Sequence, residues 1–397
     1  MKKSKMYGML SFIIFTFLFV TVVLILEFGG ILSKEKDVLP PTSVEVGDTE
    51  GEKEDLEDST DKEQGNEEGK NEDEAVNPGE EEDTDEEIGG DISMVFAGDI
   101  YMSDYVTKAY DKDGIDGILS KELQDEFIGA DIAMANQEFA FSTRGEKAPN
   151  KQFTFRVNPS YGTAFRDMGL DIVTLANNHS MDFGREALLD SFDTLNQLDI
   201  LYVGAGKDRD EAKTTRYMEV KGKTIAFLAA SRVIPVPEWN AGTTSAGLFT
   251  TYDPTELIEE IKTAREISDY VVVYVHWGIE RDTRPQTYQR NMGKQYIDAG
   301  ADLVIGSHPH VLQGVEYYNG KPIVYSLGNF MFYNEIKQTA LLKVTLKEEE
   351  AEISLLPCKA SGGRTYLQEG EWTEFDSYME GISYDVKYSN GLIIPLQ

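Results

Sequence analysis

The segment 301-ADLVIGSHPHVLQG-314 consists of a short apolar run, a Gly-Ser pair and two histidines separated by Pro309. Residues i and i+2 of an extended segment face the same side, and proline stiffens the backbone between them. The imidazoles of His308 and His310 can therefore converge, either on a metal pair or on one metal and its ligand. An H-x-H pair is a weak signal alone, and it gains weight here because it follows a predicted strand.

The same pattern of a short apolar run that ends in Gly, Asn, His or Ser recurs through the chain from residue 92. We predict strands at 93–98, 131–136, 171–177, 201–206, 224–231, 270–278, 302–308 and 322–329. We predict helices at 185–198, 253–267 and 286–300. Strands that alternate with helices indicate an α/β domain whose sheets are covered by helices. The segment 341-LLKVTLKEEEAEISLLP-357 alternates like a hairpin, so we expect a C-terminal β extension of this domain from about residue 336.

Polar side chains that can bind metal stand at the ends of these predicted strands, and they include all four histidines of the chain. They are Asp99, Asn136, Glu138, Asn177, Asn178, His179, His276, His308 and His310. In open α/β sheets, ligands bind beyond the carboxyl ends of the strands. Mixed imidazole and carboxylate ligands favour Mn, Zn or Fe. The single Cys358 rules out a cysteine cluster, so we predict a centre for one or two divalent ions.

Further side chains near these strand ends are candidates for binding substrate. Arg156, Arg281 and Arg284 could hold a carboxylate or a phosphate by bidentate contacts, or could form ordinary surface ion pairs. Trp277 and Glu280 could shape the mouth of the pocket, although Trp277 could equally pack in the core. We also count Asn136 and Asn177 among the candidate substrate contacts.

The first 33 residues predict a membrane anchor. Three lysines precede an apolar run from Met6 to Leu26, whose 21 residues just span a hydrocarbon core of about 30 Å. A cleaved signal peptide would have a shorter apolar core and a small-residue cleavage site, which "EFGGILSKEK" does not provide. We therefore expect a single-pass helix in the cell membrane, with the rest of the chain outside the cytoplasm.

Residues 34–90 contain 24 acidic and 5 basic side chains and no aromatic residue. Such a segment cannot bury enough apolar surface to offset the entropy of ordering, so we expect a disordered, self-repelling tether. The predicted organisation is thus an anchor at 1–33, an acidic linker at 34–90 and a folded extracytoplasmic domain at 91–397.

The folded domain is itself acidic. Removing the anchor segment (+2) and the linker (−19) from the formal charge of −34 leaves −17 for residues 91–397. This charge argues against nucleic acid as a partner, because nucleic acid requires a basic patch. An anionic substrate would need a local source of positive charge, which a bound metal would provide.

Eight blocks in the order and spacing seen here resemble the CapA family of poly-γ-glutamate capsule biosynthesis proteins. They are FAGDIYM (96–102), NQEFAFS (136–142), FRVNP (155–159), DIVTLANNHSMDFG (171–184), YVGAGKDRDEA (202–212), VVVYVHWGIE (271–280), AGADLVIGSHPHVLQG (299–314) and IVYSLGNFMF (323–332). The predicted anchor also fits the membrane-attached, extracytoplasmic members of the family in Gram-positive bacteria. The resemblance implies a partnership with other membrane subunits of the polymer-synthesis machinery and contact with an anionic polymer.

The CapA family in turn resembles the calcineurin-like metallophosphoesterases, which implies a βα sandwich with a dimetal site at the strand ends. By this resemblance the metal ligands are Asp99, Glu138, Asn178, His276, His308 and His310. Glu138 stands where the ligand that bridges two ions would be. His179 would act on the substrate, as an imidazolium that stabilises an oxyanion or protonates a leaving group.

Three positions depart from the metallophosphoesterase pattern. Tyr101 stands where the first motif usually has a histidine, and the second motif is Asn-Gln-Glu, without the usual aspartates. Ser180 follows His179, so the carboxylate that orients this histidine would have to be Asp182.

The residues by themselves imply only a metal site, and three hypotheses remain open. The first is a component of poly-γ-glutamate synthesis or export, either a metal-dependent hydrolase or amide-ligating enzyme or a non-catalytic subunit that binds polymer through metal. The second is a stand-alone phosphoesterase whose metal polarises the scissile group and lowers the pKa of water. The third is a structural wall protein without metal.

Overall fold

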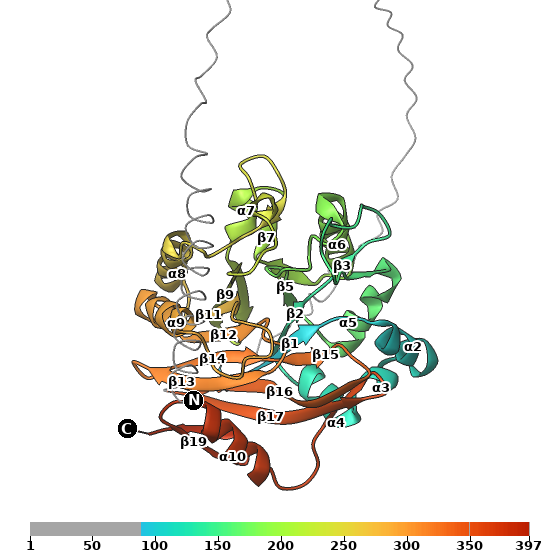
Figure 1. Cartoon of the computed structure of the whole chain (residues 1–397). Helices are drawn as coiled ribbons and strands as arrows, with labels where there is room; N and C mark the ends of the chain where they lie inside the picture. Colours follow the sequence, from blue (N-terminus) through green and yellow to red (C-terminus); the bar gives the residue numbers. More distant parts are fainter. Residues whose placement is uncertain (1–88, 349, 397) are drawn as a thin grey trace, which may run out of the picture. The chain divides into compact units, whose positions relative to one another are not determined.

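The computed structural model describes residues 89–348 and 350–396 (Figure 1). These residues belong to one compact unit, Glu81–Gln397. The predicted membrane anchor and all but the last two residues of the predicted linker lie outside the described part. Within that part, no helix has the length and apolar character needed to cross a membrane.

The first sheet has the strand order β19-β20-β17-β16-β1-β2-β5-β6, with β15 beside β1 and β18 beside β17. Its parallel half consists of β1 (Ile92–Ile100), β2 (Ile132–Gln137), β5 (Ile172–Thr174) and β6 (Leu201–Val203). Its antiparallel half consists of β16 (Glu335–Leu346), β17 (Ala351–Ser361), β18 (Arg364–Leu367), β19 (Val386–Ser389) and β20 (Leu392–Pro395). The short β15 (Asn329–Met331) runs parallel to β1.

The second sheet has the order β13-β14-β12-β11-β9-β8. Its strands are β8 (Arg216–Val220), β9 (Lys223–Ser231), β11 (Tyr270–His276), β12 (Leu303–Ser307), β13 (Leu312–Tyr318) and β14 (Lys321–Leu327). The four central strands β9, β11, β12 and β14 are parallel, so their carboxyl ends lie at one edge.

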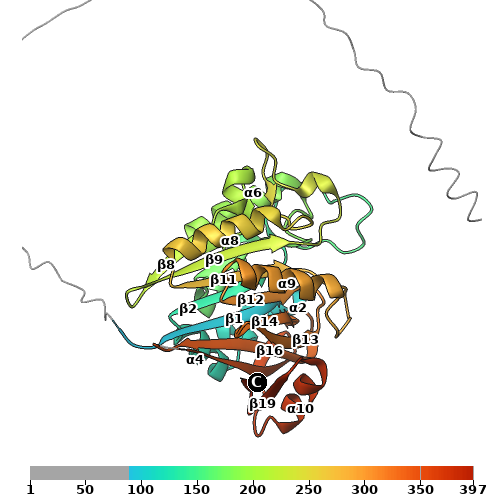
Figure 2. The same ribbon diagram turned by 90° about the vertical axis from the view of Figure 1, so that its left-hand side faces the viewer.

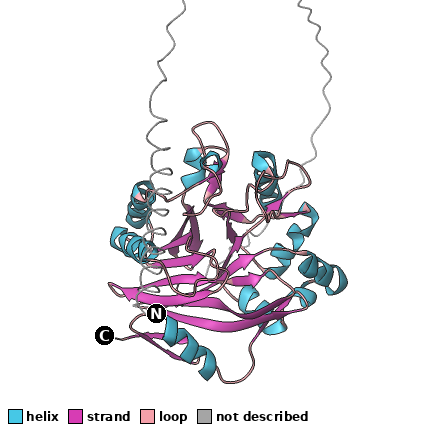
Figure 3. Cartoon of the chain, in the orientation of Figure 1, coloured by secondary structure: helices cyan, strands magenta, loops and turns pink. Residues whose placement is uncertain are grey.

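The two sheets face each other and enclose a shared apolar core. Met94 and Phe96 on β1 belong to the same buried cluster as Val272 and Tyr274 on β11. Strand residues alternate between faces, so the intervening side chains point outward and pack against helices. Figures 2 and 3 show the resulting arrangement, with helices outside the strand layers.

Helices cover the outer face of each sheet. The first sheet packs against α4 (Lys121–Ile128), α5 (Thr163–Met168) and α6 (Gly184–Gln197). The second packs against α8 (Thr255–Ile267) and α9 (Thr287–Ala299), and α10 (Thr373–Ile382) packs into the shared core. The remaining elements are α2 (Asp104–Asp113), α3 (Ile115–Ile118), α7 (Arg209–Lys213), β3 (Ala140–Phe141), β4 (Arg156–Val157), β7 (Ala205–Gly206), β10 (Gly247–Leu248) and the 3-10 turns Pro159–Gly162 and Pro237–Trp239.

The predicted α/β class is confirmed, and each predicted strand and helix has a counterpart at its position. The predicted C-terminal hairpin is also present as β16 and β17. The hairpin is part of the first sheet, because β16 pairs with β1 from Ile92 to Phe96. The hairpin therefore completes the sheet that carries the first site residue.

Gly306, which lies just before the two histidines, packs too closely for any side chain. An added Cβ would lie 2.0 Å from the carbonyl oxygen of Tyr325 and 2.3 Å from Trp277 Nε1. We expect Gly306→Ala to lower the free energy of unfolding by roughly 3 kcal/mol or more, measured by chemical denaturation. Gly381→Ala is the matched control, since its Cβ would meet nothing within 4 Å. Equal effects of the two changes would contradict this expectation.

Candidate metal centre

Carboxylates from the first sheet meet histidines from the second sheet at the carboxyl ends of the strands. Asp99 lies in β1, and Glu138 directly follows β2. His276 ends β11, and His308 and His310 follow β12. Two groups form in which the ligand atoms lie within 4.8 Å of one another: Glu138 with His276 and His308, and Asp99 with Glu138 and His310. Glu138 belongs to both groups.

Several buried polar atoms in this cluster lack the hydrogen bonds that buried groups normally make. Neither carboxylate oxygen of Glu138 has a hydrogen-bond partner among the described residues, and Glu138 is fully buried. His308 Nδ1 is likewise buried without a partner in that part of the chain. Because burying an uncompensated carboxylate is costly, a divalent cation between these groups fits the site.

The electrostatics of the cluster favour a cation as well. Burial raises the pKa of Glu138 well above its usual range, and the charge of Asp99 adds to the rise. Burial lowers the pKa of His276 well below that of a free histidine and lowers that of His308 to about 3. Both imidazoles are therefore neutral at pH 7, the state in which histidine binds metal.

His310 behaves differently in the metal-free protein. Burial alone would lower its pKa, but the charges of Glu138 and Asp99 raise it to about 10. Its Nδ1 lies 3.4 Å from Asp99 Oδ2 and 3.8 Å from Glu138 Oε2. A protonated His310 thus supplies the positive charge that a metal would otherwise bring.

The backbone of the H-x-H segment departs from the extended form expected from its sequence. His308 and His310 have φ values of 100° and 58°, a region that residues with a side chain seldom adopt. The two rings nevertheless stay close, with centroids 6.0 Å apart. Each histidine belongs to a different group, so this arrangement favours the metal-pair interpretation of the motif.

The imidazole of His276 is oriented by its neighbours. Its Nδ1 lies 3.0 Å from the Ser307 hydroxyl, which leaves Nε2 directed toward Glu138 Oε1 at 3.5 Å and Asn178 Oδ1 at 2.7 Å. A hydrogen bond at the second ring nitrogen is the usual way in which a metal-binding histidine is oriented. The structure therefore brings the predicted ligand Asn178 next to the cluster.

Asn136 and Asn177 were predicted to contact substrate, and the structure places them underneath the site instead. Both are fully buried. Asn136 Nδ2 donates to Asp99 Oδ1 at 2.8 Å, and Asn177 Nδ2 donates to Asn136 Oδ1 at 3.0 Å. Asn177 Oδ1 also accepts from the backbone N–H groups of His179 and Ser180. These amides position the site residues and have no exposed atom for a substrate.

His179 and Asp182 form the predicted pair. Asp182 Oδ2 lies 2.6 Å from His179 Nδ1, so the carboxylate orients the ring. His179 Nε2 makes no hydrogen bond with any described residue and remains available. The ring of Phe155 stacks on the imidazole with centroids 4.1 Å apart. The backbone N–H of Phe155 also donates to Asp182. Burial lowers the pKa of His179, although Asp182 opposes this change.

Lys151 is a site residue that the sequence did not reveal. Its ammonium group donates to the Asn178 carbonyl and to Asp182, and it lies 3.1 Å from His179 Nδ1. Burial lowers the pKa of Lys151, although the charge of Asp182 opposes this change. It follows β3 in a segment without hydrophobic periodicity, where lysine is ordinarily a surface residue, so no local pattern marks it.

Other contacts to the centre also come from residues not predicted. Asn329 Oδ1 lies 2.7 Å from His310 Nδ1. An aromatic wall flanks His179 and His310, and it consists of Tyr101, Phe155, Phe332 and Tyr333. Tyr101 stands where the metallophosphoesterase pattern has a histidine, and it serves here as part of this wall.

Trp277 and Arg156, two of the residues predicted near the mouth of the site, make contacts within the protein. Trp277 is fully buried and donates to the Tyr325 carbonyl, so its predicted contact with substrate is wrong and its role is packing. Arg156 bonds to the Arg144 carbonyl and lies over the Phe183 ring.

Arg284 donates to the Gly381 carbonyl in α10 and lies apart from the cluster contacts. Glu280 and Arg281 are exposed, and burial raises the pKa of Tyr333 beside the cluster, with the charge of Glu280 adding to the rise and that of Arg281 opposing it. These two therefore remain candidates for the mouth of the site.

In the metal-free protein, we expect His308 and His310 to give the free energy of unfolding opposite pH dependences below and above pH 6.5. The folded-state pKa of His308 is about 3, so its contribution is lost as the pH falls from 6.5. The folded-state pKa of His310 is about 10, so its contribution, roughly a few kcal/mol, is lost as the pH rises from 6.5 through 10. Melting temperatures in chelator test this expectation, and His310→Gln should reduce the alkaline decline. A melting temperature that rises steadily above neutral pH would contradict it.

Taken together, the fold and the site define an α/β protein with a buried cluster of carboxylates and histidines that could hold a metal ion. A protein-family profile described as "Bacterial capsule synthesis protein PGA_cap" matches residues 93–334, more than half of the chain. The chain belongs to this family, as the resemblance in its sequence blocks predicted.

Two curated relatives support the same assignment. The chain is 34% identical over 262 residues to "PGA biosynthesis protein CapA" of Bacillus subtilis (strain 168), covering 65% of this chain and 68% of that protein. It is 29% identical over 272 residues to "Capsule biosynthesis protein CapA" of Bacillus anthracis, covering 66% of each. The match thus spans about two thirds of either relative.

Solved structures give weaker similarities. A hypothetical protein from Thermus thermophilus aligns with a TM-score of 0.45 and 17% identity over 68% of this chain and 100% of that chain. The NAD nucleotidase NadN of Haemophilus influenzae aligns with a TM-score of 0.43 and 12% identity over 76% of this chain and 65% of that chain. Similarities at this level do not assign a function.

Proposed function

We propose that this protein is a membrane-anchored component of poly-γ-glutamate synthesis or export whose extracytoplasmic domain binds one or two divalent metal ions. The observation that carries the metal centre is the fully buried Glu138, whose two oxygens lack hydrogen bonds within the described residues and which is shared by two ligand groups. Family membership and the names of the Bacillus relatives support the pathway. The apolar run from Met6 to Leu26 supports the anchor.

Two sets of ligands would hold the ions. Asp99, Glu138 and His310 would hold one, and Glu138, His276 and His308 would hold the other, with Asn178 Oδ1 beside His276. A divalent metal bound there supplies Lewis-acid activation of water and of the scissile carbonyl or phosphoryl group. Mn, Zn and Fe suit this donor set.

The protein's own groups would orient the substrate and move a proton. Asp182 holds His179 through Nδ1, so Nε2 is the atom that would exchange a proton with a leaving group. The aromatic wall would limit the access of water, and the metal together with Lys151 would supply positive charge to an anionic polymer. Partner subunits in the membrane would bring the polymer to this face.

Elemental analysis of the purified full-length protein tests the centre. We expect between one and two equivalents of Mn, Zn or Fe, retained through gel filtration and removed by chelator. Absence of stoichiometric metal after loading would contradict the metal centre and favour a structural wall protein.

A stand-alone phosphoesterase is the second candidate, and the His179–Asp182 pair beside two ligand groups favours it. Turnover of generic phosphodiesters by the metal-loaded protein, abolished by His179→Ala with metal content unchanged, would support this activity. Bound metal without such turnover would favour the role in polymer synthesis or a subunit that binds polymer without catalysis.

A further inference from the structure

A cavity of about 280 Å³ adjoins the metal cluster, and His310 and Asn329 line it. These two side chains contact each other at 2.7 Å, and His310 also belongs to one of the ligand groups. The other residues that line this cavity are Val311, Leu312, Tyr333, the start of β16 and Tyr378 in α10. A molecule held at the cluster can therefore extend past His310 into this cavity.

The cavity is lined by polar side chains that have no partner in the described part of the protein. They are Tyr333, Glu335, Lys337, Gln338 and Tyr378. Among residues 89–348 and 350–396, none of these side chains makes a hydrogen bond or an ion pair. Four of the five can donate hydrogen bonds, and only Glu335 is restricted to accepting them.

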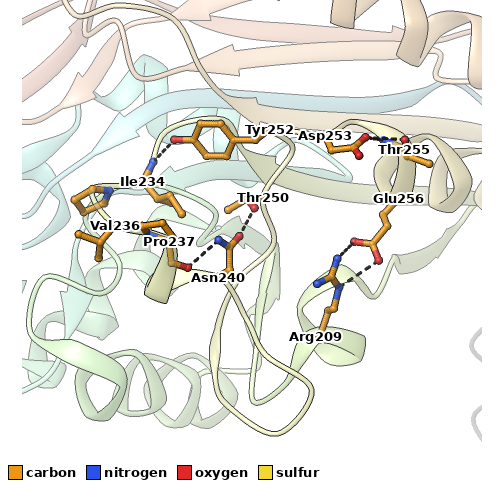
Figure 4. Close-up of a pocket in the computed structure, with 11 residues that line it drawn as sticks. Arg209, Ile234, Val236, Pro237, Asn240, Thr250, Tyr252, Asp253, Thr255 and Glu256 are labelled. Atoms are coloured by element: carbon orange, nitrogen blue, oxygen red, sulfur yellow. Dashed lines mark hydrogen bonds and ion pairs between the residues drawn. The ribbon is translucent and has the colours of Figure 1, made fainter. Parts of the chain in front are cut away.

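A larger cavity elsewhere shows the opposite pattern. It measures about 670 Å³, and Arg209, Asn240, Tyr252 and Glu256 contribute to its lining (Figure 4). There Arg209 pairs with Glu256, Asn240 donates to the Pro237 carbonyl, and the Tyr252 hydroxyl accepts from the backbone N–H of Ile234. Those polar groups are satisfied within the protein, whereas the polar side chains of the smaller cavity have no partner among the described residues.

The charges of the smaller cavity select a type of ligand. Glu335 and Lys337 are both exposed, and both line the cavity at the start of β16. Lys337 suits a carboxylate, whereas Glu335 suits an N–H donor. A phosphodiester has no N–H group, but an amide-linked chain with free carboxylates offers both. The buried side chains of Leu312 and Ile336 can pack against methylene groups.

We infer that the cavity beside His310 is a subsite that binds one residue of an amide-linked polyanion. The adjacent residue of the same polymer lies at the metal cluster. This inference rests on the proposed function and assigns it a binding site. Lys337 binds the free carboxylate, Glu335 accepts the amide N–H, and Gln338 and the two tyrosines donate to the remaining oxygens.

Calorimetric titration of the full-length, Mn-loaded protein with a short γ-linked glutamate oligomer tests this subsite. We expect Lys337→Gln to weaken binding about tenfold, the effect of losing one charge-assisted hydrogen bond. Lys387→Gln is the matched control, because Lys387 is also an exposed strand lysine, and it makes no ion pair within the described residues. Its dissociation constant should equal that of the wild type.

The outcomes separate this subsite from the proposed function. Equal affinities of the wild type and Lys337→Gln would overturn the subsite and leave the metal centre and polymer contact standing. An equal loss of affinity in both lysine variants would also overturn the subsite. It would indicate a nonspecific charge attraction, which salt screens. If the wild-type protein fails to bind the oligomer, both the polymer contact and the subsite are wrong, while metal analysis still tests the centre.

Discussion

Glu138→Gln is expected to remove metal from both positions of the centre. Glu138 belongs to each of the two ligand groups, whereas His276, His308, Asp99 and His310 each belong to one. The amide keeps the shape of the carboxylate but loses its charge, so we expect metal affinity to fall by roughly a hundredfold or more, since changes to outer-shell partners already cost ten- to hundredfold. Calorimetry with Mn or Zn and elemental analysis would measure the loss.

A comparison with His308→Asn makes this experiment specific. That change affects only the group of Glu138, His276 and His308, so we expect it to remove one ion and leave the other. Because Glu138→Gln also removes one charge partner of His310, chemical denaturation of both metal-free proteins serves to separate loss of metal from loss of folding. Full metal content in Glu138→Gln would exclude the bridging role.

Cells that carry His276→Ala or His308→Ala are expected to lose poly-γ-glutamate from their surface. Both imidazoles are buried, and their lowered pKa values keep them neutral and able to bind metal. Both belong to the same ligand group, in which Glu138 is the third member. Loss of either should empty one metal position and stop the step that depends on it. Immunodetection of surface polymer against a complemented deletion would measure the effect.

Two controls separate loss of function from loss of folding. His276 is 1% exposed, so alanine leaves a cavity there and could lower protein levels. Protein abundance is therefore measured in the same cells, and Glu138→Gln serves as a variant of nearly unchanged volume. Lys387→Gln should leave the polymer unchanged. Normal polymer in the His276 and His308 variants at normal protein levels would eliminate an essential role for the metal.

Much of the site could be predicted because strand-end chemistry is a local property. Asp99, Glu138 and the histidines follow apolar runs that are visible in the sequence, and the carboxyl ends of parallel strands meet at one edge. The family resemblance pointed to Asp182 as the carboxylate that would orient His179, and Asp182 lies 2.6 Å from that ring. The carboxylate and the histidine share one short turn, so their contact depends on little else.

Other features required the folded chain. Asn136, Asn177 and Trp277 were indistinguishable by sequence from substrate contacts, and only their burial shows that they support other residues. Lys151 reaches the His179–Asp182 pair from a distant loop.

The sequence by itself determined the α/β class, the strand-end position of the histidines and the family, because periodicity and ordered motifs are carried by neighbouring residues. The tertiary structure decided that Glu138 is shared by two ligand groups and that His308 and His310 belong to different ones. It also decided that β16 lies beside β1. These relations depend on the register of the strands and on how two sheets face each other, which are set by long-range packing.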